Sequence, residues 1–433
     1  MSRYLAVPPN VCLRIEDFGC IVFDKLTGTL VELDRDAATM LHYIDNSGSA
    51  AEDVIMSRFA DQNSAAGVLG RLLDLGILQV VSPRVLPVDR AVSPIPWPSG
   101  PQLAAPETVH WAITYRCNQN CPDCYARRHI HSFADELDTT AAAQLVDMLA
   151  DWGIFQLSIG GGEPLLRPDL AFICEHARQS GLVVHVTTGY HCVSSELLHS
   201  LRDTISVLQI GAKHHKLLEG PVAECEKLSN TVRSAHDLGI GVGANLMLSN
   251  TVMVHFDELI NLIAQAGIKR ITLLRYKPPA DQSQWILENP SPDKWRDFEQ
   301  LFCDTIRRYP ELIFRVDCAL SFLQRGITSD NAQALGIRGC VAGERILALT
   351  PDGSAYPCSQ LVRPGMRAGN LLIDNPNDLW ACSSAMISCR SYRESDKFAQ
   401  SKCGMCEAKG HCGGCRVFAD DGRGCDPGCP ESY

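Results

Sequence analysis

Residues 115–125 read Tyr-Arg-Cys-Asn-Gln-Asn-Cys-Pro-Asp-Cys-Tyr, so three cysteines stand in the spacing C-x3-C-x2-C. They come directly after residues 110–115, HWAITY, which predict a β-strand. Three thiolates on one compact loop can hold three irons of a [4Fe–4S] cube and leave the fourth iron without a protein ligand. Such an open iron is needed if a small molecule is to chelate the cluster. The alternative for this motif is a zinc site completed by His129 or His131.

Short apolar segments alternate with amphipathic ones from residue 109 to about residue 315. This alternation predicts an α/β fold in which a parallel sheet, as a full or partial barrel, is covered by helices. The predicted strands are residues 110–115, 155–161, 182–189, 206–212, 239–248, 269–276 and 312–316. The predicted helices include residues 139–153, 170–181, 222–239 and 256–267.

A smaller α/β unit is predicted before this region. Its strands are residues 12–17, 19–24 and 28–34, and the last two are joined by a hairpin loop that ends at Gly28. Its helices are residues 37–44, 50–59 behind Ser49, and 65–77 behind Ser64. Seven prolines in residues 83–106 then predict a stiff linker between domains. We therefore expect domains at residues 1–82, 107–315 and 316–433. The last consists of irregular loops after about Ala319, which need stabilisation by something other than an apolar core.

The composition is typical of a folded protein that binds metal. The chain has 433 residues, enough for two or three domains, and 45% of them are apolar, which excludes a disordered protein. Its net charge of −11 argues against a nucleic-acid partner. The first residues form neither a basic nor an apolar export segment, and no long apolar run predicts a membrane span, so we expect a cytoplasmic protein. In that reducing compartment, 20 cysteines indicate metal ligands rather than disulfides.

The loop with Cys117, Cys121 and Cys124 resembles the motif of the radical S-adenosylmethionine (SAM) superfamily, which follows the first strand of a partial (β/α)6 barrel. The match extends to Gly161-Gly162-Glu163-Pro164 after the second predicted strand. The resemblance implies that the cysteines hold a [4Fe–4S] cluster and that this second loop binds the methionine amine of SAM, with glycines that let backbone approach the ligand. It also implies the reaction. The reduced cluster donates an electron to SAM, the C–S bond breaks, and a 5′-deoxyadenosyl radical takes a hydrogen atom from the substrate.

Two further residues are assigned from the same resemblance. Thr188 stands where relatives often have Asn in Thr-Asn-Gly, and its hydroxyl is expected at the SAM ribose or carboxylate. Arg275, at a predicted strand end, stands where relatives often hold the SAM carboxylate; a surface arginine on the barrel rim is the alternative. The sequence departs from the superfamily at residues 211–214, where Gly-Ala-Lys-His replaces the common Ser-Leu-Asp-Gly.

Eight cysteines are concentrated between Cys382 and Cys429, whereas scattered ones such as Cys174, Cys303 and Cys318 lie in apolar segments and are expected in cores. The C-terminal pattern resembles the SPASM extension of radical SAM peptide-modifying enzymes, with two residues where the family commonly has three between the last cysteines of its run. The resemblance implies two auxiliary clusters. Cluster I would be held by Cys340, Cys358 and Cys415, and cluster II by Cys403, Cys406, Cys412 and Cys429. A structural zinc ribbon would use only four of these thiols.

Cluster I has three assigned cysteines. The first two in the sequence, Cys340 and Cys358, bracket a hairpin that is predicted to turn at Pro351-Asp352-Gly353. One iron should then lack a thiolate unless Cys382, Cys389 or Cys425 folds back. An iron of that kind could accept an electron from a substrate radical or bind a substrate thiolate. We therefore expect Cys340, Cys358 and Cys415 to form the catalytic auxiliary site.

The N-terminal unit resembles the small peptide-chaperone domain of pyrroloquinoline-quinone biosynthesis, a winged-helix-like fold. Fused to radical SAM enzymes, it captures the leader of a precursor peptide by strand addition. The whole resemblance implies a maturase for a ribosomally made peptide, which it cross-links, decarboxylates or otherwise modifies, with flavodoxin or ferredoxin as electron donor. The sequence Cys-Gly-Gly-Cys-Arg at residues 412–416 favours an alternative, an enzyme that decarboxylates tetrapyrrole side chains. A non-catalytic iron–sulfur or zinc interaction protein is the third interpretation.

Overall fold

The computed structural model describes residues 3–59, 61–82, 94–129, 135–278, 282–419 and 422–431. The chain forms two compact units, Met1–Ala104 and Ala105–Tyr433. His131 and residues 83–93 of the predicted linker lie outside the described residues.

The first unit contains two small antiparallel sheets, in the orders β2-β3-β4 and β5-β1-β6. Its strands are β1 Tyr4–Ala6, β2 Val11–Glu16, β3 Gly19–Asp24, β4 Thr29–Asp34, β5 Ala50–Ala51 and β6 Gln79–Val81. Its helices are α1 Arg35–Asn46, α2 Glu52–Met56 and α3 Gln62–Asp74. The predicted strands β2 to β4 and the turn at Gly28, with a φ of 71°, are confirmed.

Two details of this unit differ from the sequence expectation. Helix α3 begins one turn earlier than predicted because Asp61, not Ser64, accepts the first free backbone amides. Helix α2 follows Ala51, whose segment pairs with β1 instead of extending the helix back to Ser49. Strands of two or three residues such as β5 leave no periodic signal in the sequence.

The second unit is built on one ten-stranded sheet, in the order β13-β12-β11-β10-β9-β8-β7-β14-β15-β16. Its strands are β7 Thr108–Thr114, β8 Gln156–Gly161, β9 Val183–Thr188, β10 Val207–Gly211, β11 Gly241–Leu248, β12 Arg270–Arg275, β13 Ile313–Val316, β14 Ile346–Leu349, β15 Ser354–Tyr356 and β16 Gly369–Asn370. Strands β7 to β13 are parallel and lie in sequence order, which confirms the predicted parallel sheet. Strand β14 extends the sheet beside β7, also in parallel.

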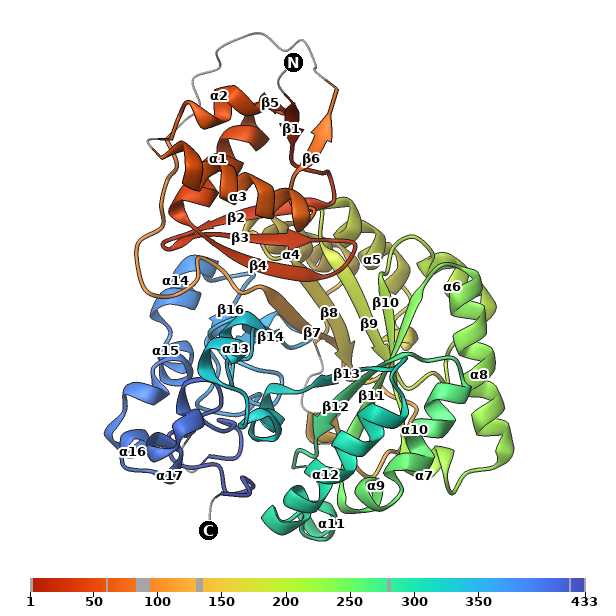
Figure 1. Cartoon of the computed structure of the whole chain (residues 1–433). Coiled ribbons are helices and arrows are strands. Elements are labelled where there is room, and N and C mark those ends of the chain that lie inside the picture. Colours follow the sequence, from red (N-terminus) through yellow and green to blue (C-terminus); the bar gives the residue numbers. More distant parts are fainter. Residues whose placement is uncertain are drawn as a thin grey trace. The chain divides into compact units, whose positions relative to one another are not determined.

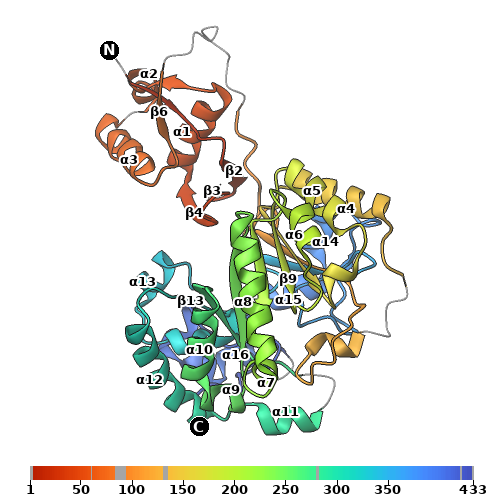
Figure 2. The ribbon, with the colours of Figure 1, turned by 90° about the vertical axis from the view of Figure 1, so that its right-hand side faces the viewer.

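The helices follow the strands as the alternation predicts. Those of the βα region are α4 Thr139–Asp151, α5 Leu170–Gln179, α6 Ser195–Leu201, α7 His214–Leu217, α8 Val222–Asp237, α9 Asn250–Val254, α10 Phe256–Gln265, α11 Gln282–Glu288 and α12 Pro292–Arg308. Short 3-10 turns are η1 Tyr125–His129, η2 Pro164–Leu166 and η3 Cys318–Gln324. Figure 1 and Figure 2 show the long helices along the outside of the curved sheet.

Apolar side chains on alternate strand positions fix this arrangement. Leu157 and Ile159 of β8 pair in register with Val184 and Val186 of β9, and all four are at most 1% exposed, in one core with α4 and α5. Burying each such side chain contributes roughly 1.5–3 kcal/mol. The intervening positions, which include Ser158 and Gly160 of β8, face the other side of the sheet, where the candidate site lies.

The chain after β13 contains more helix than the expectation of irregular loops. Its elements are α13 Ser329–Ala334, α14 Pro376–Cys382, α15 Ser384–Arg390, η4 Tyr392–Glu394, α16 Asp396–Ala399, α17 Lys402–Met405 and η5 Glu407–Gly410. These helices are too short for a periodic apolar pattern, which is why the sequence did not reveal them. The predicted hairpin turning at Gly353 is confirmed by the antiparallel pairing of β14 and β15. None of the helices in the described part of the chain is long and apolar enough to cross a membrane.

Candidate active site

The cysteine loop leaves β7 at the edge of the sheet where the parallel strands end. Cys117, Cys121 and Cys124 carry free thiols that are partly exposed. Burial raises the pKa of the Cys117 thiol, and the charges of the two other thiols raise it further, so the three groups are near neighbours. Three soft donors on one loop fit three irons of a cluster.

Two glycines allow the neighbouring loop to press against this one. At Gly161, with a φ of 114°, a Cβ would lie 2.3 Å from the Thr114 carbonyl oxygen, and at Gly162 it would lie 2.3 Å from that of Arg116. The Gly162 amide instead donates to Thr114 at 2.8 Å, and the Glu163 amide donates to Arg116 at 2.8 Å. The glycines thus admit the backbone of the cysteine loop itself, a contact that the resemblance did not imply.

Glu163 and Thr188 are brought together by adjacent strands. The buried Glu163 carboxylate accepts hydrogen bonds from the Thr188 hydroxyl at 2.9 and 3.0 Å, from the Gly189 amide at 2.9 Å and from the Leu165 amide at 3.1 Å. Burial raises the pKa of Glu163 and these donors lower it, with burial prevailing. The Thr188 hydroxyl, expected at SAM, therefore holds the glutamate of the Gly-Gly-Glu-Pro loop in place.

A cationic contact from the loop after β10 was missed by the sequence analysis. The Lys213 Nζ atom lies 3.1 Å from Oδ2 of Asp123, which is 6% exposed and stands between two of the motif cysteines. The Lys216 Nζ atom donates to the Gln119 side chain at 2.6 Å. Burial would raise the pKa of Asp123, but the charge and hydrogen bond of Lys213, together with His215 and His214, outweigh it and lower the pKa. The departure from Ser-Leu-Asp-Gly at residues 211–214 could have predicted this contact, because it puts Lys213 at the end of a strand.

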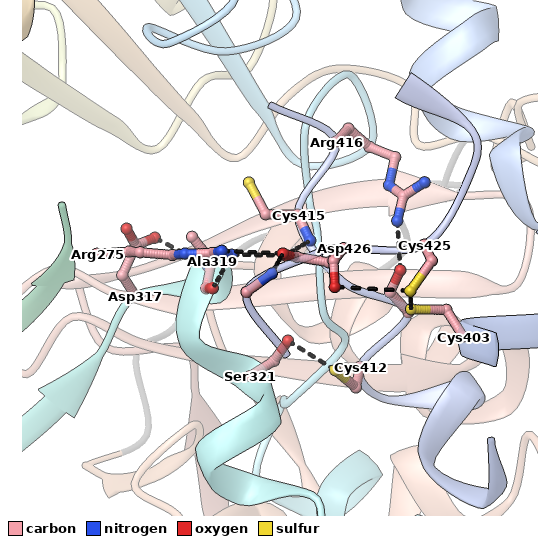
Figure 3. Close-up of polar contacts among 12 residues, drawn as sticks. Arg275, Asp317, Ala319, Ser321, Cys403, Cys412, Cys415, Arg416, Cys425 and Asp426 are labelled. Atoms are coloured by element: carbon pink, nitrogen blue, oxygen red, sulfur yellow. Dashed lines mark hydrogen bonds and ion pairs between the residues drawn. The ribbon is translucent and has the colours of Figure 1, made fainter. Parts of the chain in front are cut away.

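Arg275 makes a contact other than the one implied by the resemblance. Its guanidinium binds both carboxylate oxygens of Asp426, at 2.5 and 2.9 Å, and both side chains are at most 1% exposed (Figure 3). The ring of Phe418 lies under the guanidinium, 3.7 Å away. Asp426 also accepts the amides of Cys415 and Gly428. Burial would raise the pKa of Asp426, but Arg275 and these amides outweigh it and lower the pKa. Arg275 thus joins β12 to the C-terminal cysteine segment.

The thiols assigned to cluster I are joined by a fourth. Cys340 and Cys389 are each 5% exposed and share one apolar cluster, against which Cys358 packs. A hydrogen bond with Cys340, and then burial, raise the pKa of Cys415 well above its usual value. Burial and the charge of Cys358 raise the pKa of Cys389 to about 12. Cys389, on α15, has therefore folded back toward the other three.

The thiols assigned to cluster II also have an additional neighbour. The Cys425 sulfur lies 3.7 Å from that of Cys403, and Figure 3 shows the two in contact. Burial is the main cause that raises the pKa values of Cys403, Cys412 and Cys429. The charges of Cys425 and Cys429 raise the pKa of Cys403 further, that of Cys412 raises the pKa of Cys429, and that of Cys406 raises the pKa of Cys412. Five thiols thus gather where the resemblance implied four.

The alternative zinc site and the scattered cysteines can also be compared with the structure. Within the described ranges, no three His, Cys, Asp or Glu side chains are arranged to hold a single metal ion, and the His129 ring packs against Tyr115 at 5.3 Å. Cys174 lies in the core as predicted. Cys303 is exposed, because its position on α12 faces solvent, so it is not a core residue. Cys318 is half-buried, burial raises the pKa of its thiol well above the usual value, and the thiol hydrogen-bonds to Asp317.

Comparisons with known proteins agree with this geometry. Residues 111–263 match the model of the radical SAM superfamily, and residues 340–407 match that of the SPASM iron–sulfur cluster-binding domain. The mycofactocin maturase MftC of Mycobacterium tuberculosis is 26% identical over 331 residues, which are 72% of this chain and 78% of that protein. An AdoMet-dependent heme synthase of Methanosarcina barkeri is 24% identical over 336 residues, 73% of this chain and 92% of that protein.

Solved structures share the fold over nearly the whole chain. SuiB of Streptococcus suis bound to S-adenosylmethionine superposes with a TM-score of 0.71 at 18% identity and covers 95% of this chain and 96% of its own. SuiB bound to precursor peptide SuiA gives a TM-score of 0.70 with the same coverage.

Proposed function

We propose that this chain, a radical SAM enzyme whose cofactors are S-adenosylmethionine and [4Fe–4S] clusters, matures a ribosomally synthesised precursor peptide. The observation that carries the proposal is the extent of the likeness to SuiB. The likeness spans 95% of this chain. The candidate site within it has a cysteine loop and a Gly-Gly-Glu-Pro loop in backbone contact. The mycofactocin maturase match supports the same substrate class.

The bound cofactors would supply a 5′-deoxyadenosyl radical that abstracts a hydrogen atom from the peptide. The chain would hold the reactive cluster with Cys117, Cys121 and Cys124. The loop 161–164 would receive the methionine end of SAM, with Glu163 fixed by Thr188 for that contact. Lys213 would keep the loop electrically balanced by neutralising Asp123.

The C-terminal thiols would hold two auxiliary clusters. We assign Cys340, Cys358 and Cys415 to cluster I, and Cys403, Cys406 and Cys412 to cluster II. The fourth position of cluster II falls to Cys429 or Cys425, and the contact between Cys425 and Cys403 makes Cys425 an equal candidate. Clusters of this kind would accept or relay electrons within the chain, and a flavodoxin or ferredoxin would be the electron donor.

Residues 1–82 would recognise the leader of the precursor, in the manner of the pyrroloquinoline-quinone chaperone and its winged-helix-like fold. Among the described strands, β2 and β4 each pair only with β3 in their sheet, so both have a free edge. Strand β4 alternates exposed and half-buried residues along its length. An edge of this kind accepts an extended peptide through backbone hydrogen bonds.

Tetrapyrrole decarboxylation is the second candidate function. The AdoMet-dependent heme synthase match favours it, because that relative aligns over 92% of its own length. For either substrate we propose a cytoplasmic enzyme, since 20 free thiols require a reducing compartment.

The test compares the two substrate classes with the reconstituted full chain, SAM and a reductant. One arm offers a small peptide encoded beside the gene, and the other a tetrapyrrole with propionate side chains. We expect a mass change in the peptide alone, with stoichiometric 5′-deoxyadenosine. Deleting residues 1–90 should raise the KM for the full precursor and spare uncoupled SAM cleavage, because remote binding and chemistry reside in different parts of the chain. Turnover of the tetrapyrrole alone would refute the proposal.

A further inference from the structure

Helix α15 brings Cys389 to the thiols of cluster I. Cys340 and Cys389 lie in one buried cluster with Ala342 and Leu361, and Cys358 packs against it. Cys389 precedes Cys403 by fourteen positions and belongs to no cysteine pair in the sequence. Its place is therefore set by the fold and not by local spacing.

Backbone hydrogen bonds of Gly343 hold the segments that carry Cys358 and Cys389 close to the segment that carries Cys340. The Gly343 amide donates to the carbonyl of Pro357 at 3.0 Å, the residue before Cys358. Its carbonyl accepts from Nε and Nη2 of Arg390 at 3.0 and 2.8 Å, the residue after Cys389. Gly343 has a φ of 66°, and a Cβ there would meet the Met386 backbone of α15 at 3.2 Å. One residue, Gly343, thus ties the neighbours of Cys358 and Cys389 to the segment that follows Cys340.

The other cysteines that could fold back are placed elsewhere. Cys382, on α14, is exposed. The Cys425 sulfur is in contact with Cys403, on the side of cluster II. Cys318 is also near Cys415 and Cys358, but its thiol donates to the Asp317 carboxylate.

We propose that Cys389 is the fourth protein ligand of auxiliary cluster I, beside Cys340, Cys358 and Cys415. A [4Fe–4S] cube with four thiolates has no iron left for a substrate. The inference rests on the proposed auxiliary clusters and replaces the expected open iron. Cluster I then acts in electron transfer only, and the peptide does not ligate it.

The experiment measures auxiliary iron in a full chain in which Cys117, Cys121 and Cys124 are all alanine. Two cubes give about eight irons per chain in this background. Adding Cys389→Ala should either remove about one iron and produce the electron paramagnetic resonance signal of a three-iron cluster, or remove about four irons with the whole of cluster I. Cys389→Ser preserves the side-chain volume and offers a weaker oxygen ligand, so it should keep more iron and shift the signal and the reduction potential. The control Cys382→Ala should match the background.

Three outcomes would overturn the assignment. The first is that both Cys389 variants have the same iron content, paramagnetic resonance signal and reduction potential as the chain in which only Cys117, Cys121 and Cys124 are alanine. The second is loss of iron from Cys318→Ala instead. The third is a background of only about four irons, which means that no second auxiliary cluster exists. These measurements use no substrate, so a failure of peptide maturation leaves them unchanged and is told apart from a failure of this inference.

Discussion

The parallel core and the cysteine-rich segment belong to one compact unit, yet different interactions organise them. In the core, strands and helices bury continuous rows of Leu, Val and Ile, and the alternation is readable in the sequence. After β13, short helices are joined by glycines in tight contact, buried arginines and thiols. For example, a Cβ at Gly339 would lie 1.8 Å from the Cys412 carbonyl oxygen, and Arg416 donates to the carbonyls of Gly422 and Gly424. Apolar burial specifies the first region, whereas polar contacts and metal ligation specify the second.

The largest effect is expected where the two kinds of organisation meet, in the loop after β7. Changing Cys117, Cys121 or Cys124 separately to Ala should abolish 5′-deoxyadenosine formation, because three irons need three thiolates. The exposed Cys303→Ala is the matched control and should leave product formation unchanged. Wild-type rates in any one of the three loop variants, followed by chromatography of the nucleoside, would remove the loop from the reactive site.

Removal of iron should separate the two regions. After anaerobic chelation, hydrogen exchange of backbone amides in residues 403–429 should accelerate by orders of magnitude, because ligation supplies folding free energy there. The amides of β8 and β9 should keep their protection, since their buried side chains pack with those of α4 and α5, and no cysteine assigned to a cluster lies on these four elements. Equal acceleration in both regions, read by mass spectrometry, would show that the core also depends on the clusters.

Asp426→Asn should lower the free energy of unfolding by about 3–5 kcal/mol, because it leaves Arg275 charged and buried without its partner. The control Asp304→Asn breaks an exposed ion pair with Arg307 and should cost less than about 1 kcal/mol. Denaturant unfolding of the iron-loaded chain measures both.

The lowered pKa of Asp426 gives this prediction a pH dependence. The ionised carboxylate contributes its full stabilisation above the ordinary carboxyl pKa of about 4. That contribution is lost as the pH falls toward the lower folded-state pKa. The stability difference between the wild-type chain and Asp426→Asn should therefore narrow below about pH 4, and a constant difference would contradict the buried ion pair.

The smallest effect distinguishes two glycines that stand two positions apart, Gly160 of β8 and Gly162 of the loop that follows it. Gly162→Ala should slow SAM cleavage by about 100-fold, because its Cβ would displace the cysteine loop by a fraction of an ångström to an ångström. At Gly160 the added Cβ would stand 3.8 Å from the nearest atom, on Thr187, so Gly160→Ala should behave nearly as the wild type. Similar single-turnover rates in the two variants would show that the close backbone approach has no role in positioning SAM.

The sequence predicted the parts of the molecule whose signal is local. The seven parallel strands and the hairpins at Gly28 and Gly353 follow from periodicity and turn chemistry. The contacts of Arg275 could not be predicted, because its partner Asp426 is 151 positions away and an arginine at a strand end fits several roles. The same is true of Cys389, whose position depends on α15 packing against Gly343.

Thr188 shows a different limit. Its hydroxyl was expected at the SAM ribose or carboxylate, and its place at the end of β9 puts it beside the loop after β8, since neighbouring parallel strands end at one edge. Its partner, Glu163, was not foreseen, because a hydroxyl serves a ligand and a buried carboxylate equally well.

The pairing of β14 with β7, together with the ion pair between Arg275 and Asp426, bears on how such enzymes can be recombined. The catalytic barrel and the cysteine-rich extension look like interchangeable modules in the linear sequence. In this chain they share a sheet and a buried charge pair. A chimera that joins residues 1–315 to the extension of a relative would lose the charge pair unless the donor supplies an acidic partner and a glycine at the position of Gly428, where a Cβ would stand 2.0 Å from Arg275. The two parts are therefore structurally coupled and are best transplanted together.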